Sequence, residues 1–513
     1  MIQGQVEGTP QDQAAQDRAA QDRAGERGTG RGADFLQLDP SAARHGLADW
    51  LTAALRDAVG DGRLGRGDRL PATRVLAEQL GVSRGVVVDA YRRLTDEGLL
   101  RGRRGGGTTV LADPPAPVAA PAEPATPPAR IDLRPGVPDL SAFPRQAWLR
   151  AERAALARTP DAALGYGDPR GTPELRTALA GWLARSRGVR ADPSTIVVVG
   201  GVAQGLALLA QVLVGRAATP GVAHGPHPVP RTPVLPRRGV ATVGYEDPGS
   251  RGTREQLERW DVRLVPVPVD GLGLDVAALA ATGAEAVFVT PAHQFPTGVV
   301  LAPQRRRALL EWARAGGLVI EDDYDAEHRY DRTPVAALAA LAPERVVHLG
   351  SVSKTLAPAL RLGWVVAPAA VREELVVRKQ WSDITSPALG QLALAELITS
   401  GAFERHLRAG RTRLRHRRDA LLDALREHLP GGRVQGVAAG LHLVVGLPEG
   451  VDDAAVAVRA LAAGVAVQPL SYHRLRPGPP GLVIGYAAAS PDRIRAGVRL
   501  LAAAVRAEGG PTG

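Results

Sequence analysis

A helical pattern of hydrophobic residues opens the region from about residue 41 to residue 112. Apolar side chains recur at three- and four-residue spacing in three short segments, which predicts three amphipathic helices. Gly81 follows the second helix, where glycine commonly ends a helix, and Ser83 can cap the third. Residues 99–110 then predict two short strands joined by a tip rich in Arg and Gly. The apolar positions that define the three helices are Leu47, Leu51, Leu55, Leu76, Leu80, Val87, Tyr91 and Leu94.

The pattern changes from about residue 131 to residue 508. Short apolar runs, each rich in Val and Ile, alternate there with stretches of helical periodicity, which is typical of an α/β fold. A Pro-rich stretch at 217–239 interrupts this alternation, and we expect an inserted surface loop there. The clearest strand-like runs are residues 197–199, 287–289, 318–320 and 346–349.

Two segments lack a hydrophobic pattern. Residues 1–40 are polar and repeat the sequence AAQDR, so we expect a disordered tail. Residues 113–130 form a Pro-rich linker, with seven prolines among the 17 residues from Asp113 to Ala129. A stiff chain of that length spans on the order of 50 Å. We therefore expect two folded bodies, a compact, Arg-rich domain at 41–112 and an α/β domain at 131–508.

Length and composition agree with several domains and exclude some functions. The chain has 513 residues and no cysteine, so disulfides, Cys-ligated zinc and a Cys nucleophile are excluded. The N-terminus has no apolar segment of a secretory signal. Residues 193–214 carry no charge, but Gly200, Gly201 and Gln204 interrupt them, and we expect a buried strand, a turn and a helix instead of a membrane span. These features predict a cytoplasmic protein.

The choice of basic residues is more informative than the net charge of +10. Only two lysines are present, Lys354 and Lys379, and every other basic residue is Arg. A lysine amine can form an imine with an aldehyde, whereas a guanidinium stays protonated. Composition alone leaves two interpretations open: chemistry that requires an amine, or two surface lysines present by chance.

The predicted N-terminal domain has the outline of a winged helix-turn-helix. The N-terminus of its third helix can enter a DNA major groove, and Arg103 or Arg104 on the Gly-rich wing can approach phosphates or the minor groove. A small protein-binding module with a solvated Arg face is the alternative. LPATRVLAEQLGVSRGVVVDAYRRLTDEGLL resembles the GntR-type winged helix. That resemblance implies DNA contacts by Arg74, Ser83, Arg84 and Gly105.

Acidic residues follow one of the predicted strands in the large domain. Residues 318–320 run directly into EDDYD, and the carboxyl end of a parallel strand usually faces the ligand crevice. Glu321, Asp322 and Asp323 can also be oxygen ligands of a divalent metal ion. A solvated loop is a third interpretation.

A second strand leads into GSVSKTLAPALRLG, which contains Lys354. Ser351, Ser353 and Arg361 flank the lysine, and this combination suits a phosphorylated aldehyde: the amine takes the carbonyl while hydroxyls and guanidinium hold the phosphate. A phosphate-binding lysine without a covalent role is the alternative. The Gly-Gly turn after residue 199 can also hold a phosphate at the N-terminus of a helix.

Two further motifs, TPAHQFPTG at 290–298 and a Gly-rich loop around Tyr166, complete a set that resembles a fold-type I aminotransferase, the pyridoxal 5′-phosphate (PLP) fold. With the winged helix, the chain resembles the MocR subfamily of GntR regulators. The resemblance implies that Lys354 forms a Schiff base with PLP, and it argues against a metal site at EDDYD. It implies that Asp322 pairs with the ring nitrogen, that Tyr324 bonds the ring 3′-oxygen, and that His293 and Gln294 lie near the ring. The residues that it implies for the phosphate are Ser351, Ser353, Arg361, the backbone of Gly201 and Val202, and Tyr166 of a second subunit.

Two departures from the aminotransferase pattern bear on activity. Ser250 follows EDPG, where the family often has an aromatic residue stacked on the ring. The late segment PPGLVIGYAAAS has no Arg to clamp a substrate carboxylate. Arg251, Arg474 and Arg476 are the candidates to replace it. Without a clamp the substrate is poorly oriented, and transamination loses much of its rate, because orientation supplies a large part of it.

The resemblance predicts a PLP-dependent transcriptional regulator. We expect a homodimer that binds double-stranded operator DNA, has no membrane association, and senses PLP or a small amino compound through Lys354. A working aminotransferase with an appended DNA-binding domain is the alternative from another class. A repressor with a vestigial PLP site is the third.

Overall fold

The computed structural model describes residues 36, 38–43, 46–103, 107–111, 129–215, 241–330, 335–436 and 438–508. The chain divides into two compact units, Met1–Thr126 and Pro127–Gly513. The expected tail at 1–40 and linker at 113–130 lie largely outside the described residues, and the expected loop at 217–239 lies wholly outside them.

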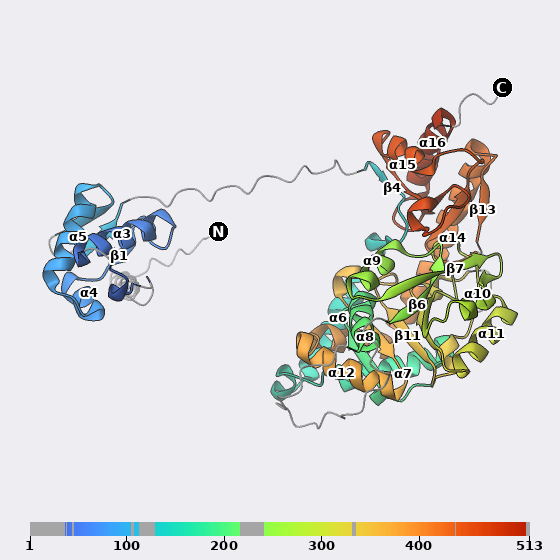
Figure 1. Cartoon of the computed structure of the whole chain (residues 1–513), viewed down its shortest axis with the longest axis horizontal. Coiled ribbons are helices and arrows are strands. Elements are labelled where there is room, and N and C mark those ends of the chain that lie inside the picture. The colour runs from blue at the N-terminus through green and yellow to red at the C-terminus, as the bar shows by residue number, and fades with distance from the viewer. Residues whose placement is uncertain are drawn as a thin grey trace, which may run out of the picture. The chain divides into compact units, whose positions relative to one another are not determined.

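The first unit is a winged helix-turn-helix (Figure 1). Gly81 has a φ of 63° and ends the second helix, a conformation that glycine adopts without steric cost. Ser83 occupies the N-cap position of the third helix, but its side chain makes no capping hydrogen bond. The predicted apolar positions Leu51, Leu76, Val87 and Leu94 are buried in one core. The elements are α3 (Leu47–Gly60), α4 (Thr73–Leu80), α5 (Arg84–Asp96) and an antiparallel sheet in the order β1 (Arg69–Leu70), β3 (Gly107–Val110), β2 (Leu100–Arg103).

The second unit is built on a large, mostly parallel sheet, as the α/β pattern predicted. Among the described residues its strand order is β5-β12-β11-β10-β9-β6-β7-β8, in which β12 and β8 run antiparallel to their neighbours. The strands are β5 (Ile196–Val199), β6 (Thr242–Asp247), β7 (Arg263–Asp270), β8 (Gly273–Leu274), β9 (Ala286–Val289), β10 (Leu318–Asp322), β11 (Val346–Ser351) and β12 (Gly363–Val366).

Helices cover both faces of this sheet. Side chains alternate along each strand, so Val319 packs into one core and Ile320 into the other. Both faces are therefore apolar, which explains the nearly uniform hydrophobic runs of the sequence. The flanking helices are α6 (Arg145–Arg158), α7 (Pro173–Arg187), α8 (Val202–Val214), α9 (Arg251–Arg259), α10 (Val276–Ala281), α11 (Pro303–Arg314), α12 (Ala369–Asp383) and α13 (Ala388–Thr399).

A smaller layer at the C-terminal end has its own core (Figure 1). The long helix α14 (Ala402–His428) leads into an antiparallel sheet in the order β13-β14-β17-β16. The short strand β4 (Ile131–Asp132), at the start of the unit, pairs with β15, which ties residues 131–132 to this layer. Its other elements are β13 (Arg433–Gln435), β14 (His442–Gly446), α15 (Asp453–Ala462), β15 (Val465–Ala466), β16 (Gln468–Pro469), β17 (Gly481–Gly485) and α16 (Pro491–Glu508).

In the part of the chain that the structure describes, none of the helices combines the length and the apolar character that crossing a membrane requires.

Candidate functional site

Three loops meet at the carboxyl ends of neighbouring parallel strands β9, β10 and β11. His293 follows β9, and its Nδ1 lies 3.1 Å from the hydroxyl of Tyr324, which follows β10. His328, on the same loop as Tyr324, has its Nε2 3.2 Å from the carbonyl oxygen of Lys354, which follows β11. The strand order therefore brings the predicted motifs of three separate sequence segments to one edge of the sheet.

The carboxylates of the EDDYD motif point to different partners. Asp323 forms a buried, bidentate ion pair with Arg187 of α7, with N–O distances of 2.5 and 2.9 Å. Glu321 accepts hydrogen bonds from the backbone N–H groups of Leu338 and Ala339. Both side chains are therefore engaged in structural contacts, and the arrangement argues against a metal ion held jointly by residues 321–323.

Asp322, between them, is left with an unsatisfied oxygen. Its Oδ1 is buried and has no hydrogen-bond partner among the described residues. Burial, reinforced by the nearby Asp323 and Asp325, raises the pKa of Asp322 to about 7, although Lys354 acts in the opposite direction. A buried carboxyl without a partner is costly, and a cationic ligand group would satisfy it.

Lys354 is partly buried beside these acids. Burial lowers its pKa from the ordinary lysine value, and the negative charges of Asp322 and Asp325 only partly offset that effect. Its Nζ donates a hydrogen bond to the carbonyl oxygen of Gly136 at 2.5 Å. The amine is thus held in place and gives up its proton more readily than an exposed lysine, as an amine nucleophile requires.

A turn with anion-binding character lies nearby, between β5 and α8. Gly201 has a φ of 96° and precedes α8, and a Cβ there would lie 3.1 to 3.3 Å from the guanidinium of Arg361. Arg361 also donates a hydrogen bond to the carbonyl oxygen of Gly200. Ser351 is buried, and its Oγ accepts from the backbone N–H of Ser353 at 3.3 Å. The N-terminus of α8 and the Arg361 guanidinium both attract anions, so this turn has the chemistry to hold a phosphate.

These groups fit PLP. The unpartnered Asp322 oxygen suits a protonated ring nitrogen, Lys354 suits an aldehyde, and the turn before α8 with Arg361 suits a phosphate. The fit rests on an unsatisfied buried acceptor, an amine with a lowered pKa and an assembled cationic turn.

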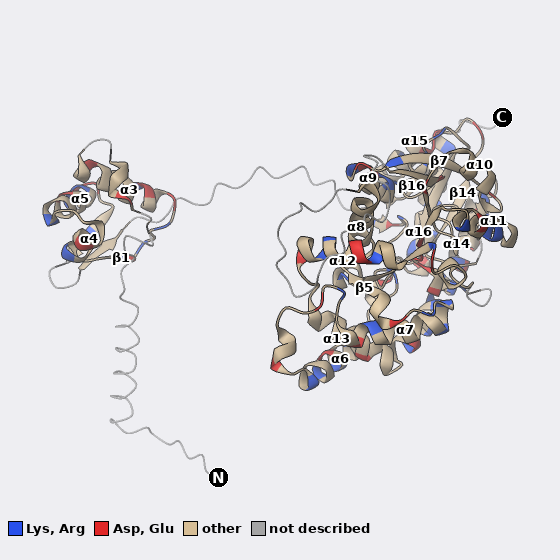
Figure 2. Ribbon diagram, turned by 60° about the horizontal axis from the view of Figure 1, so that its bottom comes forward, with Lys and Arg blue, Asp and Glu red and all other residues tan. Residues whose placement is uncertain are grey.

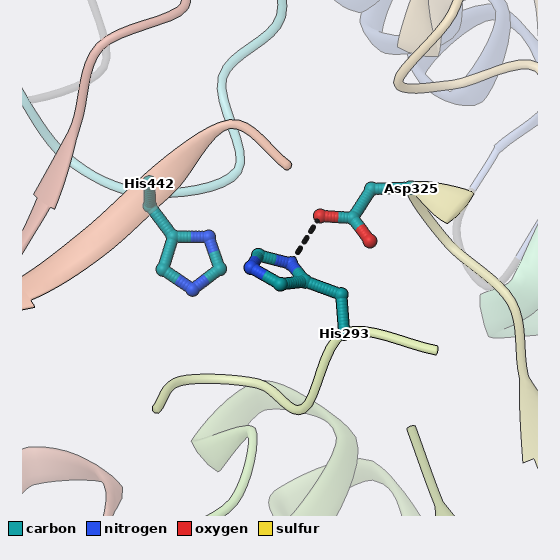
Figure 3. A group of neighbouring side chains, drawn as sticks. All are labelled: His293, Asp325 and His442. Carbon is teal, nitrogen blue, oxygen red and sulfur yellow. Dashed lines mark hydrogen bonds and ion pairs between the residues drawn. The ribbon is translucent and has the colours of Figure 1, made fainter. Parts of the chain in front are cut away.

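A buried group of His293, Asp325 and His442 borders the site (Figure 3). His293 Nδ1 lies 2.8 Å from Asp325 Oδ2, and His442 Nε2 lies 3.0 Å from the carbonyl oxygen of Pro296. The spacing would admit a metal ion, but the Asp325 oxygen and His293 Nδ1 already bind each other. We interpret the aspartate as fixing the histidine ring. Burial lowers the pKa of His442 to about 3, so that ring is neutral.

The structure does not bring Tyr166 to Lys354 within one chain. Its side chain is 87% exposed, next to a groove of about 1340 Å³ formed by α6, α7, α13 and the loops around residues 165 and 386. Its contact with the phosphate of a second subunit stays a prediction.

Ser250 and the three arginines considered as a replacement clamp have other partners in the structure. Ser250 is the N-cap of α9, and its Oγ accepts from the N–H of Thr253. Arg251 pairs with Glu255 and stacks on a tyrosine ring, while Arg474 and Arg476 donate to backbone carbonyls. The stretch 479–490 contains β17 and no Arg. No carboxylate clamp is evident among the described residues.

The DNA-binding candidates that the structure describes lie at the N-terminal ends of two helices: Arg74 in the first turn of α4, and Ser83 and Arg84 at the N-cap and start of α5. Arg74, Ser83 and Arg84 are exposed, and in the described part of the chain neither arginine forms an ion pair. Arg92 and Arg93, further along α5, are instead paired with acidic residues. Figure 2 shows the basic residues on α4 and α5. The Arg103 side chain, Arg104 and Gly105 lie outside what the structure describes.

Sequence reasoning missed Gly136 and Asp325. Asp325 belongs to the EDDYD motif, but only the contact with His293 reveals its role. Gly136 lies just after β4, at the start of the α/β domain, and the sole signal in the sequence is the Pro135–Gly136 pair.

Comparisons with known proteins identify both parts of the chain. A sequence model described as "Bacterial regulatory proteins, gntR family" matches residues 47–110. One described as "Aminotransferase class I and II" matches residues 130–227 and 243–501. Each match coincides with one of the two compact units.

Curated relatives match over nearly their whole length. The HTH-type pyridoxine biosynthesis transcriptional regulator PdxR of Corynebacterium glutamicum is 35% identical, with 87% of this chain and 93% of that protein covered. The probable rhizopine catabolism regulatory protein MocR of Rhizobium meliloti is 31% identical, with 88% and 92% covered. Among solved structures, the kynurenine aminotransferase of Pyrococcus horikoshii is 27% identical with a TM-score of 0.65, covering 74% of this chain and 91% of that one.

Proposed function

The chain belongs to the MocR subfamily of GntR-type transcriptional regulators, and we propose that it binds operator DNA through residues 47–110 and senses PLP or a small amino compound at Lys354. The observation that carries this proposal is that one chain holds both an exposed arginine pair on a helix-turn-helix and a site in which Lys354 approaches the unsatisfied Asp322. The named relatives are regulators, which favours regulation over turnover as the purpose of that site.

The residues around Lys354 have separate tasks in this proposal. Lys354 would hold the aldehyde end of PLP, and Asp322 would accept a hydrogen bond from the ring nitrogen of PLP and keep that nitrogen protonated. Tyr324 would hold the ring 3′-oxygen through its hydroxyl, and His293, which Asp325 fixes, would contact the ring. Arg361, Ser351, Ser353 and the N–H groups of Gly201 and Val202 would hold the phosphate. When bound, PLP supplies an electrophilic carbon that reacts with amines and a ring that withdraws electrons.

On the DNA side, Arg74, Ser83 and Arg84 contact the operator, and Arg103, Arg104 and Gly105 of the wing approach its backbone or minor groove. The exposure of Arg74 and Arg84 supports this assignment, because an arginine already paired with an acid has less charge and fewer hydrogen-bond donors available for a phosphate or a guanine.

We propose a homodimer as the working unit. Tyr166 and Leu164 are exposed beside the large groove next to α13, and Leu389 is exposed on that helix. A second copy would cover these apolar side chains and carry Tyr166 toward a phosphate site. Two DNA-binding heads then require two half-sites on the operator.

The effector can act only if it binds two states of the protein with different affinity. The test is binding of the purified protein to DNA from upstream of its own gene, with and without PLP, against scrambled DNA at equal salt. We expect specific binding whose affinity or footprint changes with PLP or with an amino compound. Specific binding that is indifferent to all of them, and unchanged in Lys354→Ala, would contradict the sensing role.

A further inference from the structure

The second lysine of the chain, Lys379, lies in α12 and is 0% exposed. Its Nζ lies 2.8 and 2.7 Å from the two carboxylate oxygens of Asp383 and 2.9 Å from Ser386 Oγ. An ammonium has three donors and no acceptor, so these contacts use its full capacity. The longer, planar guanidinium of Arg has a different shape, which gives a physical reason for a lysine here in a chain that otherwise uses arginine.

A chain of hydrogen bonds leads from this ion pair to the turn before α8. Asp383 Oδ2 also accepts from Gln204 Nε2 at 2.8 Å. Gln204 Oε1 in turn accepts from the backbone N–H of Gly200 at 2.6 Å. The carbonyl oxygen of Gly200 accepts from Arg361. Both polar groups of Gly200 are therefore held by side chains.

The direction of these bonds follows from the charge of Asp383. An ionised carboxylate only accepts hydrogen bonds, so the NH₂ of Gln204 must face it and the amide oxygen must face Gly200. The Lys379 ammonium donates to both carboxylate oxygens of Asp383 directly. Because the N–H of Gly200 is occupied, the turn presents the next two N–H groups, those of Gly201 and Val202, at the N-terminus of α8.

We infer that Lys379 is a positioning residue for the phosphate end of the ligand: through Asp383 and Gln204 it fixes the turn whose N–H groups receive the phosphate. The inference rests on the proposed function, in which PLP binds at this turn. It predicts that Lys379 affects recognition of the phosphate and not recognition of the ring or aldehyde.

The test compares two ligands that differ only in the phosphate. PLP and pyridoxal are titrated into full-length protein, and binding is followed by the absorbance of the chromophore. For Lys379→Met we expect the affinity for PLP to fall about tenfold, as for the loss of one charge-assisted hydrogen bond, and that for pyridoxal to change by less than about twofold. Glu373→Met, at an exposed position of α12, is the matched control and should leave both unchanged.

A second variant protects the test from a folding defect. Gln204→Met leaves the ion pair between Lys379 and Asp383 intact but removes both hydrogen bonds of the Gln204 amide, the one to Asp383 and the one from Gly200, so we expect the same selective loss of PLP affinity. The double variant should lose little more than either single variant, because both act through one chain of contacts.

Three outcomes would overturn the inference. Equal losses for PLP and pyridoxal would indicate general destabilisation, and unchanged affinities for both ligands would show that the turn does not need Lys379. If the wild-type protein itself binds PLP no more tightly than pyridoxal, the phosphate site of the proposed function is also wrong. The first two outcomes, in contrast, contradict only the role of Lys379.

Discussion

The ammonium nitrogen of Lys354 donates a 2.5 Å hydrogen bond to the carbonyl oxygen of Gly136, a residue that lies 218 positions earlier in the chain. Gly136 has a φ of 81°, and a Cβ there would lie 3.4 Å from the lysine nitrogen. The segment that directly follows the interdomain linker region thus forms one wall around the reactive amine.

Gly136→Ala should therefore weaken PLP binding. The new methyl group would lie in van der Waals contact with the lysine nitrogen and limit its movement, and the left-handed backbone adds strain on the order of 1–2 kcal/mol. Gly283→Ala is the control, because Gly283 has a φ of 67° with open space around its Cβ position. Both variants should lose similar thermal stability without ligand, and only Gly136→Ala should lose affinity in a PLP titration. Equal PLP affinities would show that the contact does not matter for binding.

The carboxyl of Asp322 should affect the stability of the protein in a way that depends on both pH and ligand. Its pKa is raised from 3.8 to about 7 in the folded, ligand-free protein. Between these values the unfolded chain has lost a proton that the folded chain retains, so this group lowers stability as the pH rises through that range. Asp322→Asn should stabilise the ligand-free protein at pH 8 by about 1–3 kcal/mol, the penalty of one buried unpaired group, and make no difference at pH 3.

With PLP present at pH 8, the wild type should instead be more stable than the Asp322→Asn variant. The carboxylate of the wild type then pairs with a protonated ring nitrogen, and the neutral amide of the variant gains less from that contact. Denaturant unfolding at the two pH values, with and without PLP, measures both effects. A variant that PLP stabilises as strongly as it does the wild type would refute the role of Asp322.

The ion pair between Asp323 and Arg187 should be purely structural. Both side chains are almost fully buried, so Asp323→Asn leaves a guanidinium without its charge partner. Breaking a buried pair in this way typically costs about 3–5 kcal/mol. We expect that loss in denaturant unfolding both with and without PLP, in contrast to the ligand-dependent effect at position 322. A specific loss of PLP affinity without loss of stability would instead place Asp323 in the ligand site.

Two arginines of α5 should contribute differently to DNA binding. Arg84 is exposed at the start of the helix, whereas Arg92 pairs with Asp89 at 2.5 Å. Arg84→Ala should cost about 1–3 kcal/mol on operator DNA if it reads a base, and should lower the salt dependence if it contacts a phosphate. Arg92→Ala is the matched control with a smaller expected loss. Electrophoretic mobility shifts at several salt concentrations distinguish the two modes, and equal losses would argue against a special role for Arg84.

The features predicted from the sequence are those that depend on local pattern. The apolar runs around Val287 and Ile320 indicated buried strands, and the rule that ligands bind at the carboxyl ends of parallel strands indicated the loops of Tyr324 and Lys354. The helix-turn-helix was predictable for the same reason, because Leu76 and Val87 mark apolar faces at helical spacing.

Contacts between distant segments could not be predicted in this way. Nothing in the local sequence connects Gly136 with Lys354, or Gln204 with Asp383, because each pair meets only through the packing of separate elements. The Lys379–Asp383 spacing is that of any helical ion pair, and its burial depends on the neighbouring strands and helices. Whether Glu321, Asp322 and Asp323 share a metal ion likewise depends on partners elsewhere in the chain, which the local sequence does not reveal.

The immobilised ammonium of Lys379 has a practical consequence for amine-directed chemistry. The chain has only two lysines, and Lys379 in α12 is buried and therefore inaccessible to reagents while the protein is folded. Lys354 is then the one lysine side chain that an acylating or reductively alkylating reagent reaches, apart from the terminal amine. The mass of the intact chain after such treatment reports how much of Lys354 is blocked by ligand, and cleavage by a lysine-specific protease after residue 379 reports unfolding.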